Sequence, residues 1–145
     1  MPKMLDMIRM VGNGELPPPP VATLIGFRLA SVQPGVAVLE LEAGPQHANP
    51  MGTLHGGIFC DLADAAMGMA WASTLDEGET FTTLELKINY LKPVWSGMLV
   101  ATGRVVGTGR TIGLTECDVV DSKNRLVARA SSTVMTLRGA QAAGR

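Results

Sequence analysis

The sequence has few of the residues from which metal sites and disulfide scaffolds are built. Its 145 residues include two cysteines, Cys60 and Cys117, and two histidines, His47 and His55. So few thiol and imidazole groups exclude a disulfide-rich secreted scaffold and a zinc knuckle, and they favour a reducing compartment. We therefore predict no structural metal and no cofactor.

Neither positive nor negative residues are in excess, and long apolar runs are absent. Twelve Lys and Arg stand against thirteen Asp and Glu, which gives a net charge of −1. Without a basic field, nucleic acid and anionic membrane surfaces are poor candidate partners. Lys3, Asp6 and Arg9 interrupt the run that a signal peptide needs, and no stretch approaches the roughly 20 apolar residues of a membrane span. We expect a soluble, cytoplasmic protein.

Aromatic residues make up 4% of the chain, whereas 46% of it is hydrophobic. This balance excludes a disordered chain and predicts one domain with a mainly aliphatic core. Apolar residues at helical spacing predict a short amphipathic helix over 3–12, and Pro17 to Pro20 then form a stiff connector. We assign residues 1–21 to this helix and connector, 22–137 to the domain, and 138–145 to a frayed tail.

A helix and six strands are predicted within the domain. From 55 to 74 the sequence is apolar on nearly every helical face except at Asp61 and Asp64, which indicates a helix buried on most sides. Alternation from Thr82 to Tyr90 predicts a strand with its even-numbered side chains buried. Short turns between the later strands imply antiparallel neighbours, hence an α+β fold with a curved sheet around one helix. The six expected strands are 23–32, 36–43, 80–91, 97–107, 111–121 and 125–137.

The most informative stretch for chemistry extends from Asn49 to Asp64. His55, Gly56 and Gly57 fall where the buried helix begins, so glycine N–H groups lie at the positive end of the helix dipole, where an oxyanion can be held. The alternative is structural: the glycines allow tight entry of the helix under the sheet, and Asn49 only caps a turn.

Asp64 is the candidate base of this stretch. It lies two turns into the helix among apolar residues, where burial raises the pKa of a carboxyl group and makes its anion a better base. A water-facing acid at the helix edge is equally consistent with the pattern, and Asp61, three residues earlier, could take either role. Spacing alone leaves these alternatives open.

The spacing along the helix has a consequence for assembly. Gly56 and Asp64 are eight residues apart, about 12 Å at 1.5 Å per residue. This is too far for both to contact one carbonyl group. If both act on the same atom, they must come from two copies of the chain, arranged about a two-fold axis with their helices antiparallel.

Three further residues have weaker functional interpretations. Met69 is a core residue or a wall of an acyl pocket. Arg110, in the Gly-rich turn after residue 107, is a phosphate ligand or a solvated side chain. Cys60 is a nucleophile by residue type, but nothing near it in the sequence lowers a thiol pKa, which favours a core role.

Several motifs occur together in order: N-P-x-G-x-x-H-G-G from Asn49, L-A-D-x-A around Asp64, T-L-E-L-K-I-N-Y-L-K-P from Thr83, and G-R-T-I-G-L-T-E-C-D-V-V-D from Gly109. With them, residues 22 to 137 resemble the hotdog-fold thioesterases of the PaaI-like, phenylacetate-pathway branch. The resemblance implies a long helix wrapped by an antiparallel sheet and dimers that often pair into tetramers. It also implies hydrolysis of acyl-CoA thioesters at the subunit interface without a cofactor.

The resemblance also implies roles for individual residues. The Gly56 N–H would bind the thioester oxygen, and Asp64 of the partner chain would be general base or nucleophile. Asn49 would orient the water or the carbonyl, and His55 would fix the loop. The Thr83 hydroxyl would position water. Substrate-binding positions would be Gly57, Arg110, Gly68 and Met69.

One position departs from the pattern of some relatives. Those that use glutamate on aromatic acyl-CoAs often carry Ser or Thr four residues past the acid, where this chain has Gly68. The departure favours an arrangement of Asp64 with Thr83. Two other functions stay open: a hotdog enoyl-CoA hydratase or dehydratase, suggested by Asn49-Pro50 and His55, and a non-catalytic acyl-CoA sensor that would use the 3–12 helix to bind a partner.

Overall fold

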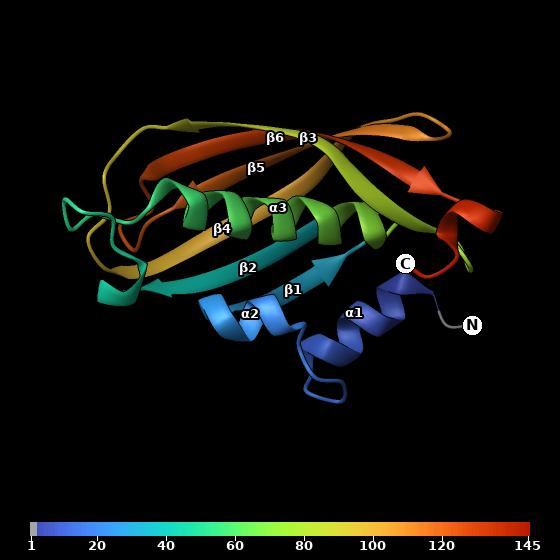
Figure 1. The fold of residues 1–145 in the computed structure, drawn as a ribbon, viewed down its shortest axis with the longest axis horizontal. Coiled ribbons are helices and arrows are strands. Elements are labelled where there is room, and N and C mark those ends of the chain that lie inside the picture. Colours follow the sequence, from blue (N-terminus) through green and yellow to red (C-terminus); the bar gives the residue numbers. More distant parts are fainter. Residues whose placement is uncertain (1–2) are drawn as a thin grey trace.

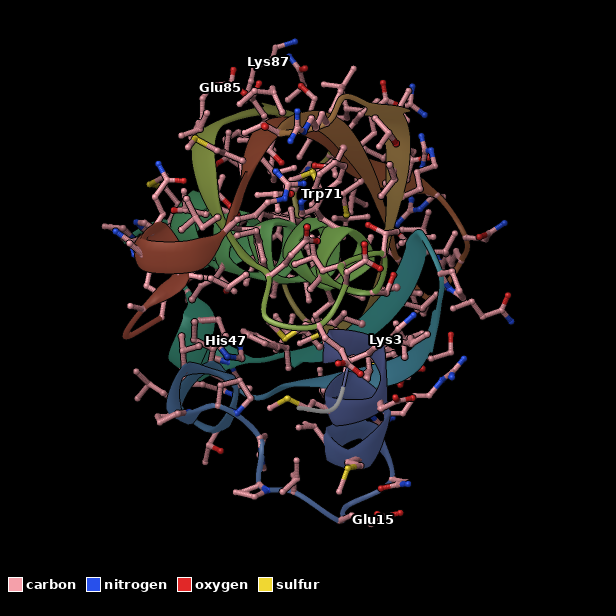
Figure 2. The ribbon with its side chains drawn as sticks, turned by 90° about the vertical axis from the view of Figure 1, so that its right-hand side faces the viewer. Lys3, Glu15, His47, Trp71, Glu85 and Lys87 are labelled. Atoms are coloured by element: carbon pink, nitrogen blue, oxygen red, sulfur yellow. The ribbon has the colours of Figure 1, made fainter. Side chains whose placement is uncertain are left out.

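The computed structural model describes residues 3–145. Its centre is a long helix, α3 (Gly56–Ala72), which lies against a six-stranded antiparallel sheet (Figure 1). Figure 2 shows the sheet curving around one side of this helix, with α1 and α2 beneath it. The predicted α+β fold with one wrapped helix is therefore confirmed. The strands are β1 (Phe27–Gln33), β2 (Val36–Ala43), β3 (Thr80–Tyr90), β4 (Gly97–Thr108), β5 (Ile112–Val120) and β6 (Leu126–Leu137).

The strand order places β3 at a free edge of the sheet. Along the sheet the order is β1-β2-β4-β5-β6-β3, and all neighbours are antiparallel. The chain leaves β2, passes through α3, and enters β3 at the far edge. One side of β3 pairs with β6, while its other side carries unpaired backbone groups, which makes it a template for another strand.

Helix α3 packs tightly on the sheet because its sheet-facing side and β4 are both built from small residues. Ala63, Ala66 and Ala70 are buried on the helix, and a Cβ placed on Gly103 of β4 would collide with the backbone of Ala66. Close approach here lets the helix contact all six strands on the sheet's concave face. The opposite stripe of α3, which includes Gly57, Asp61 and Asp64, is exposed in the protomer.

The N-terminal segment contains one predicted helix and one that was not predicted. Helix α1 (Met4–Gly12) confirms the expected helix over 3–12. The strand expected over 23–32 was wrong in its first part, because α2 (Pro20–Ile25) precedes β1. Proline at the first helical position favours the start of α2, and Gly26 ends it in a left-handed conformation with φ of 100°. These end signals outweigh the β-branched residues between them.

Two short 3-10 helices complete the chain. The first, η1 (Pro45–His47), was not predicted; the buried His47 ring joins it to α2, with Nε2 2.6 Å from the Ile25 carbonyl oxygen. The second, η2 (Gly139–Ala142), lies in the segment expected to fray. Just before it, Arg138 contacts Glu79 at 2.7 Å and holds this end against the sheet.

Strand β3 contains a bulge that changes which side chains face α3. The pairing with β6 shifts register between Thr83 and Glu85, so Leu84 is the extra residue and is 52% exposed. The strict alternation expected from Thr82 to Tyr90 is therefore wrong on the N-terminal side of Leu84. After the bulge the even positions face the core as expected; before it the odd positions do, including Thr83. Figure 2 shows Glu85 pointing away from α3.

No helix within residues 3–145 is both long and apolar enough to cross a lipid bilayer.

The tight contact between α3 and β4 predicts different responses at two glycines of one strand. Gly103→Ala should lower the free energy of unfolding by about 1–3 kcal/mol, because the new methyl group overlaps the α3 backbone. The control Gly107→Ala should cost less than about 0.5 kcal/mol, because its methyl would lie 3.8 Å from the Leu114 Cβ, an ordinary contact. Urea denaturation measures both; equal losses would contradict the packing described here.

Candidate active site

The N-terminus of α3 presents an open backbone donor. His55 is the N-cap residue, and its Nδ1 accepts a hydrogen bond from the Gly57 N–H at 2.9 Å. Gly56 is the first helical residue, and within residues 3–145 its N–H donates no hydrogen bond. An uncommitted N–H at the positive end of a helix dipole suits a developing oxyanion.

Tyr90, which the sequence analysis did not single out, fixes this helix end from β3. Its hydroxyl donates to the Gly56 carbonyl oxygen at 2.9 Å and lies 3.4 Å from the Cys60 sulfur. A Cβ on residue 56 would lie 2.8 Å from the Tyr90 oxygen, which explains the glycine. Partial burial and the neighbouring Cys60 raise the pKa of Tyr90 to about 12, so the hydroxyl stays a donor at neutral pH. The I-N-Y motif, which ends at Tyr90, was the sequence signal that could have identified this residue.

Asn49 organises the loop before α3. Its side-chain oxygen accepts from the N–H groups of Met51 at 3.0 Å and Thr53 at 3.2 Å, and its amide nitrogen donates to the Thr53 hydroxyl at 2.8 Å. The structural interpretation of Asn49 as a turn cap is therefore correct. The same residue also lines, with Gly56, a cavity of about 350 Å³ whose edge carries Lys92.

Asp64 and Thr83 form the second part of the site. The Thr83 hydroxyl donates to Oδ1 of Asp64 at 3.0 Å and joins the middle of α3 to β3. The bulge at Leu84 makes this contact possible, because an unbroken strand with the same core residues would turn Thr83 away from the helix. Both residues line a largely apolar cavity of about 470 Å³.

Asp61 and Asp64 share the exposed stripe of α3. Partial burial, with the nearby charge of Asp64, raises the pKa of Asp61. The hydroxyl of Thr83 nevertheless bonds to Asp64. The hydrogen bond from Thr83 therefore distinguishes Asp64 from Asp61, which their spacing in the sequence did not. Asp64 is exposed in the protomer, so its own chain supplies an apolar cavity beside it but not the burial expected for it.

Gly68 and Met69 also line the cavity that holds Asp64. Gly68 faces Phe81 of β3: a Cβ here would lie 3.0 Å from the ring. A Ser or Thr at this position would therefore require the Phe81 ring to move. Gly68 and Met69 thus share one cavity, and their role in substrate binding stays a prediction.

The other two predicted substrate-binding residues lie elsewhere. Gly57 uses its N–H to bond His55, so its backbone donor is occupied. Arg110 lies in the exposed turn between β4 and β5 and lines neither of these two cavities. Its carbonyl oxygen accepts from Arg138 at 2.6 Å.

The candidate residues thus form two groups on one protomer. Asn49, His55 and Gly56 stand at the start of α3, whereas Asp64 and Thr83 stand about 12 Å along it. One carbonyl group cannot contact both groups within a single protomer. In the described chain from residue 3 onward, no three His, Cys, Asp or Glu side chains gather as a metal site.

Comparison with known proteins decides the family. Residues 51–128, more than half of the chain, match the sequence profile of the thioesterase superfamily. This chain belongs to the thioesterase superfamily. The thioesterase is 29% identical over 110 residues to the 1,4-dihydroxy-2-naphthoyl-CoA hydrolase of Listeria monocytogenes, covering 76% of this chain and 89% of that protein. It is 31% identical over 107 residues to human acyl-coenzyme A thioesterase 13, covering 72% and 76%.

A solved structure supports the fold of this thioesterase. The PaaI protein of the E. coli phenylacetic acid degradation operon superposes with a TM-score of 0.82 at 23% identity, covering 94% of this chain and 97% of that one. The hotdog fold inferred from the sequence motifs is confirmed. With the family shown, the chain is a thioester hydrolase.

Proposed function

We propose that this thioesterase hydrolyses acyl-CoA to a free acid and CoA at two equal sites of a homodimer. The observation that carries the proposal is the division of the site: an open Gly56 N–H at one end of α3 and the Asp64–Thr83 pair about 12 Å further along. Acyl-CoA is the substrate class in the names of both relatives described above.

The dimer is supported by the exposed surface beside the site. The edge of β3 is unpaired, Leu84 on that strand is half exposed, and the neighbouring stripe of α3 is uncovered. A second copy placed about a two-fold axis at this edge brings the two α3 helices together in antiparallel orientation. Gly56 of the partner subunit then lies near Asp64, and the partner buries the Asp64 carboxylate, which is exposed in the protomer.

The chemistry follows from these positions. The partner's Gly56 N–H binds the thioester oxygen as negative charge develops there. Asp64, held by the Thr83 hydroxyl, removes a proton from a water whose oxygen attacks the carbonyl carbon. The tetrahedral intermediate collapses, the C–S bond breaks, and the CoA sulfur takes up the proton. Thr83 can accept a hydrogen bond from the same water, since its own proton points to Asp64.

The remaining predicted residues support this arrangement. His55 and Asn49 hold the loop and helix cap that aim the Gly56 N–H. Lys92, which lines the same cavity as Asn49 and Gly56, supplies a positive charge suited to the phosphates of CoA. Arg110 at the β4–β5 turn stays a proposed phosphate ligand, and pairing of dimers into a tetramer stays a prediction.

Removing the charge of Asp64 tests the base. Asp64→Asn should lower kcat for thiol release from acyl-CoA by at least about a hundredfold, since it keeps an acceptor for Thr83 but cannot take a proton. Asp61→Asn, the matched control three residues away, should retain activity within about threefold. A thiol-reactive dye follows CoA release from a panel of acyl-CoAs.

Assays with the same panel of acyl-CoAs also distinguish a thioesterase from a hydratase and from a non-catalytic sensor. Unchanged hydrolysis by Asp64→Asn would show that Asp64 is not the base. Hydration of crotonyl-CoA without thiol release would identify a hydratase, and binding of acyl-CoA without turnover would identify a sensor.

Removing the N–H of Gly56 tests the oxyanion donor. Gly56→Pro deletes this N–H at the first helical position, where the fixed φ of proline suits the helix backbone, and should lower kcat about 10²–10³-fold. Gly56→Ala is the control, because it adds the same Cβ beside Tyr90 but keeps the N–H. Equal activities of the two variants, measured by the same thiol assay, would exclude this donor.

A further inference from the structure

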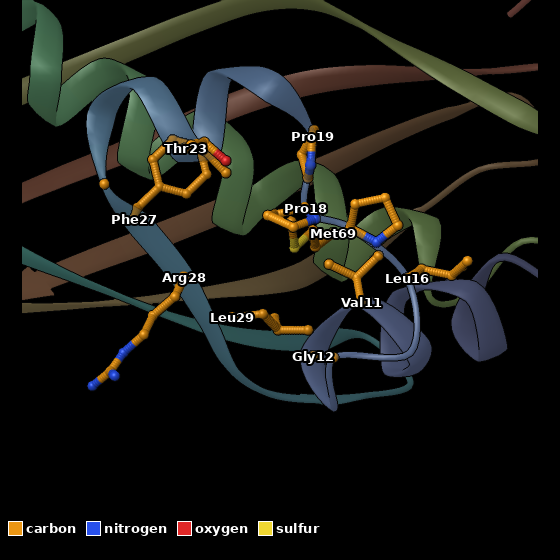
Figure 3. A pocket seen from close by; sticks show the side chains of 14 residues that line it. Val11, Gly12, Leu16, Pro18, Pro19, Thr23, Phe27, Arg28, Leu29 and Met69 are labelled. Carbon is orange, nitrogen blue, oxygen red and sulfur yellow. The ribbon is translucent and has the colours of Figure 1, made fainter.

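A second cavity lies beneath the N-terminal segment. It is a half-open groove of about 480 Å³ between α1, the proline connector, α2 and β1 (Figure 3). Its walls are largely apolar. The one charged side chain there, Arg28, extends away from the cavity in Figure 3 and is paired with Glu40 on the neighbouring strand. The main apolar lining residues are Val11, Leu16, Pro18, Phe27, Leu29 and Met69.

This cavity adjoins the one that holds Asp64. Met69 of α3 and Pro19 of the connector line both cavities. Met69 is five residues beyond Asp64, so the junction lies about 7.5 Å along the helix from the proposed base. Figure 3 shows Met69 on the α3 side of the second cavity.

The sequence keeps this cavity open. The connector is Pro17 to Pro19, because Pro20 already begins α2. Proline rings restrict this backbone, and Pro19 has the extended conformation of polyproline, with φ of −60° and ψ of 147°. The connector therefore acts as a spacer that holds α1 away from α2. A largely apolar groove of this volume beside the candidate active site suits an apolar ligand group.

We propose that this chamber, here called the distal chamber, receives the far end of the substrate's acyl chain, which makes straight-chain acyl-CoAs longer than about six carbons the preferred substrate class. The inference rests on the proposed function. With C–C bonds of about 1.5 Å and angles near 111°, an extended chain advances about 1.25 Å per carbon. About six carbons therefore span the distance from Asp64 to Met69. Further carbons pass Met69 and Pro19 into the distal chamber.

Two adjacent positions of α2 provide a matched test. Thr23 lines the distal chamber, whereas Leu24 is 84% exposed and does not. Thr23→Phe should lower kcat/KM for dodecanoyl-CoA relative to butanoyl-CoA about tenfold, because the ring occupies the space of the chain. Leu24→Phe should keep the wild-type ratio. If Thr23→Phe keeps the wild-type ratio, the distal chamber does not bind the acyl chain. If the wild-type protein hydrolyses no acyl-CoA, the proposed function itself is wrong.

An occupancy measurement tests the same point without turnover. Thr23→Cys should be alkylated by iodoacetamide at least fivefold more slowly with saturating S-dodecyl-CoA thioether than with saturating S-butyl-CoA. Leu24→Cys should react at the same rate with both, and mass spectrometry separates these sites from Cys60 and Cys117. Equal rates at Thr23→Cys with the two thioethers would contradict the proposal even if the Phe variant misfolds.

Discussion

The contact between α3 and the concave face of the sheet sets the position of every group in the candidate site. Gly103 of β4 and the alanines of α3 let the helix backbone approach the sheet closely. Once that face is buried, the stripe that bears Gly57, Asp61 and Asp64 must turn outward. The helix thus fixes the distance between the proposed oxyanion donor at its start and the carboxylate of Asp64 two turns later.

The two edges of the sheet then have separate roles. At one edge, the bulge in β3 turns Thr83 toward Asp64, and the exposed backbone beyond it offers a surface for a second copy. At the other edge, α1 packs on β1, and the proline connector and α2 border an apolar groove beside this contact. In the proposed dimer, the edge at β3 brings together the reacting groups of the two subunits. The edge at β1 carries the distal chamber, which sets the acyl-chain length that the enzyme is proposed to accept.

Much of the fold could be predicted from the sequence because periodicity and turns are local signals. The strand 36–43 and the helix over 3–12 agree with the structure to within a residue. The bulge at Leu84 depends on pairing with β6, about 50 residues away, and has no local signature. The bond from Tyr90 to Gly56 spans 34 residues and was likewise missed. Thr83 was identified through the resemblance to known thioesterases, since alternation alone placed it on the wrong face.

The central claim is that each site combines Gly56 of one subunit with Asp64 of the other. Refolding Asp64→Asn together with Gly56→Pro as an equal mixture tests it most directly, because each mixed dimer holds one doubly altered site and one intact site. Half of the dimers are then mixed, so thiol release from acyl-CoA should recover to about a quarter of the wild-type rate. If the site lies within one protomer, every site keeps a defect, and the mixture will show no more activity than the mean of the two variants assayed alone.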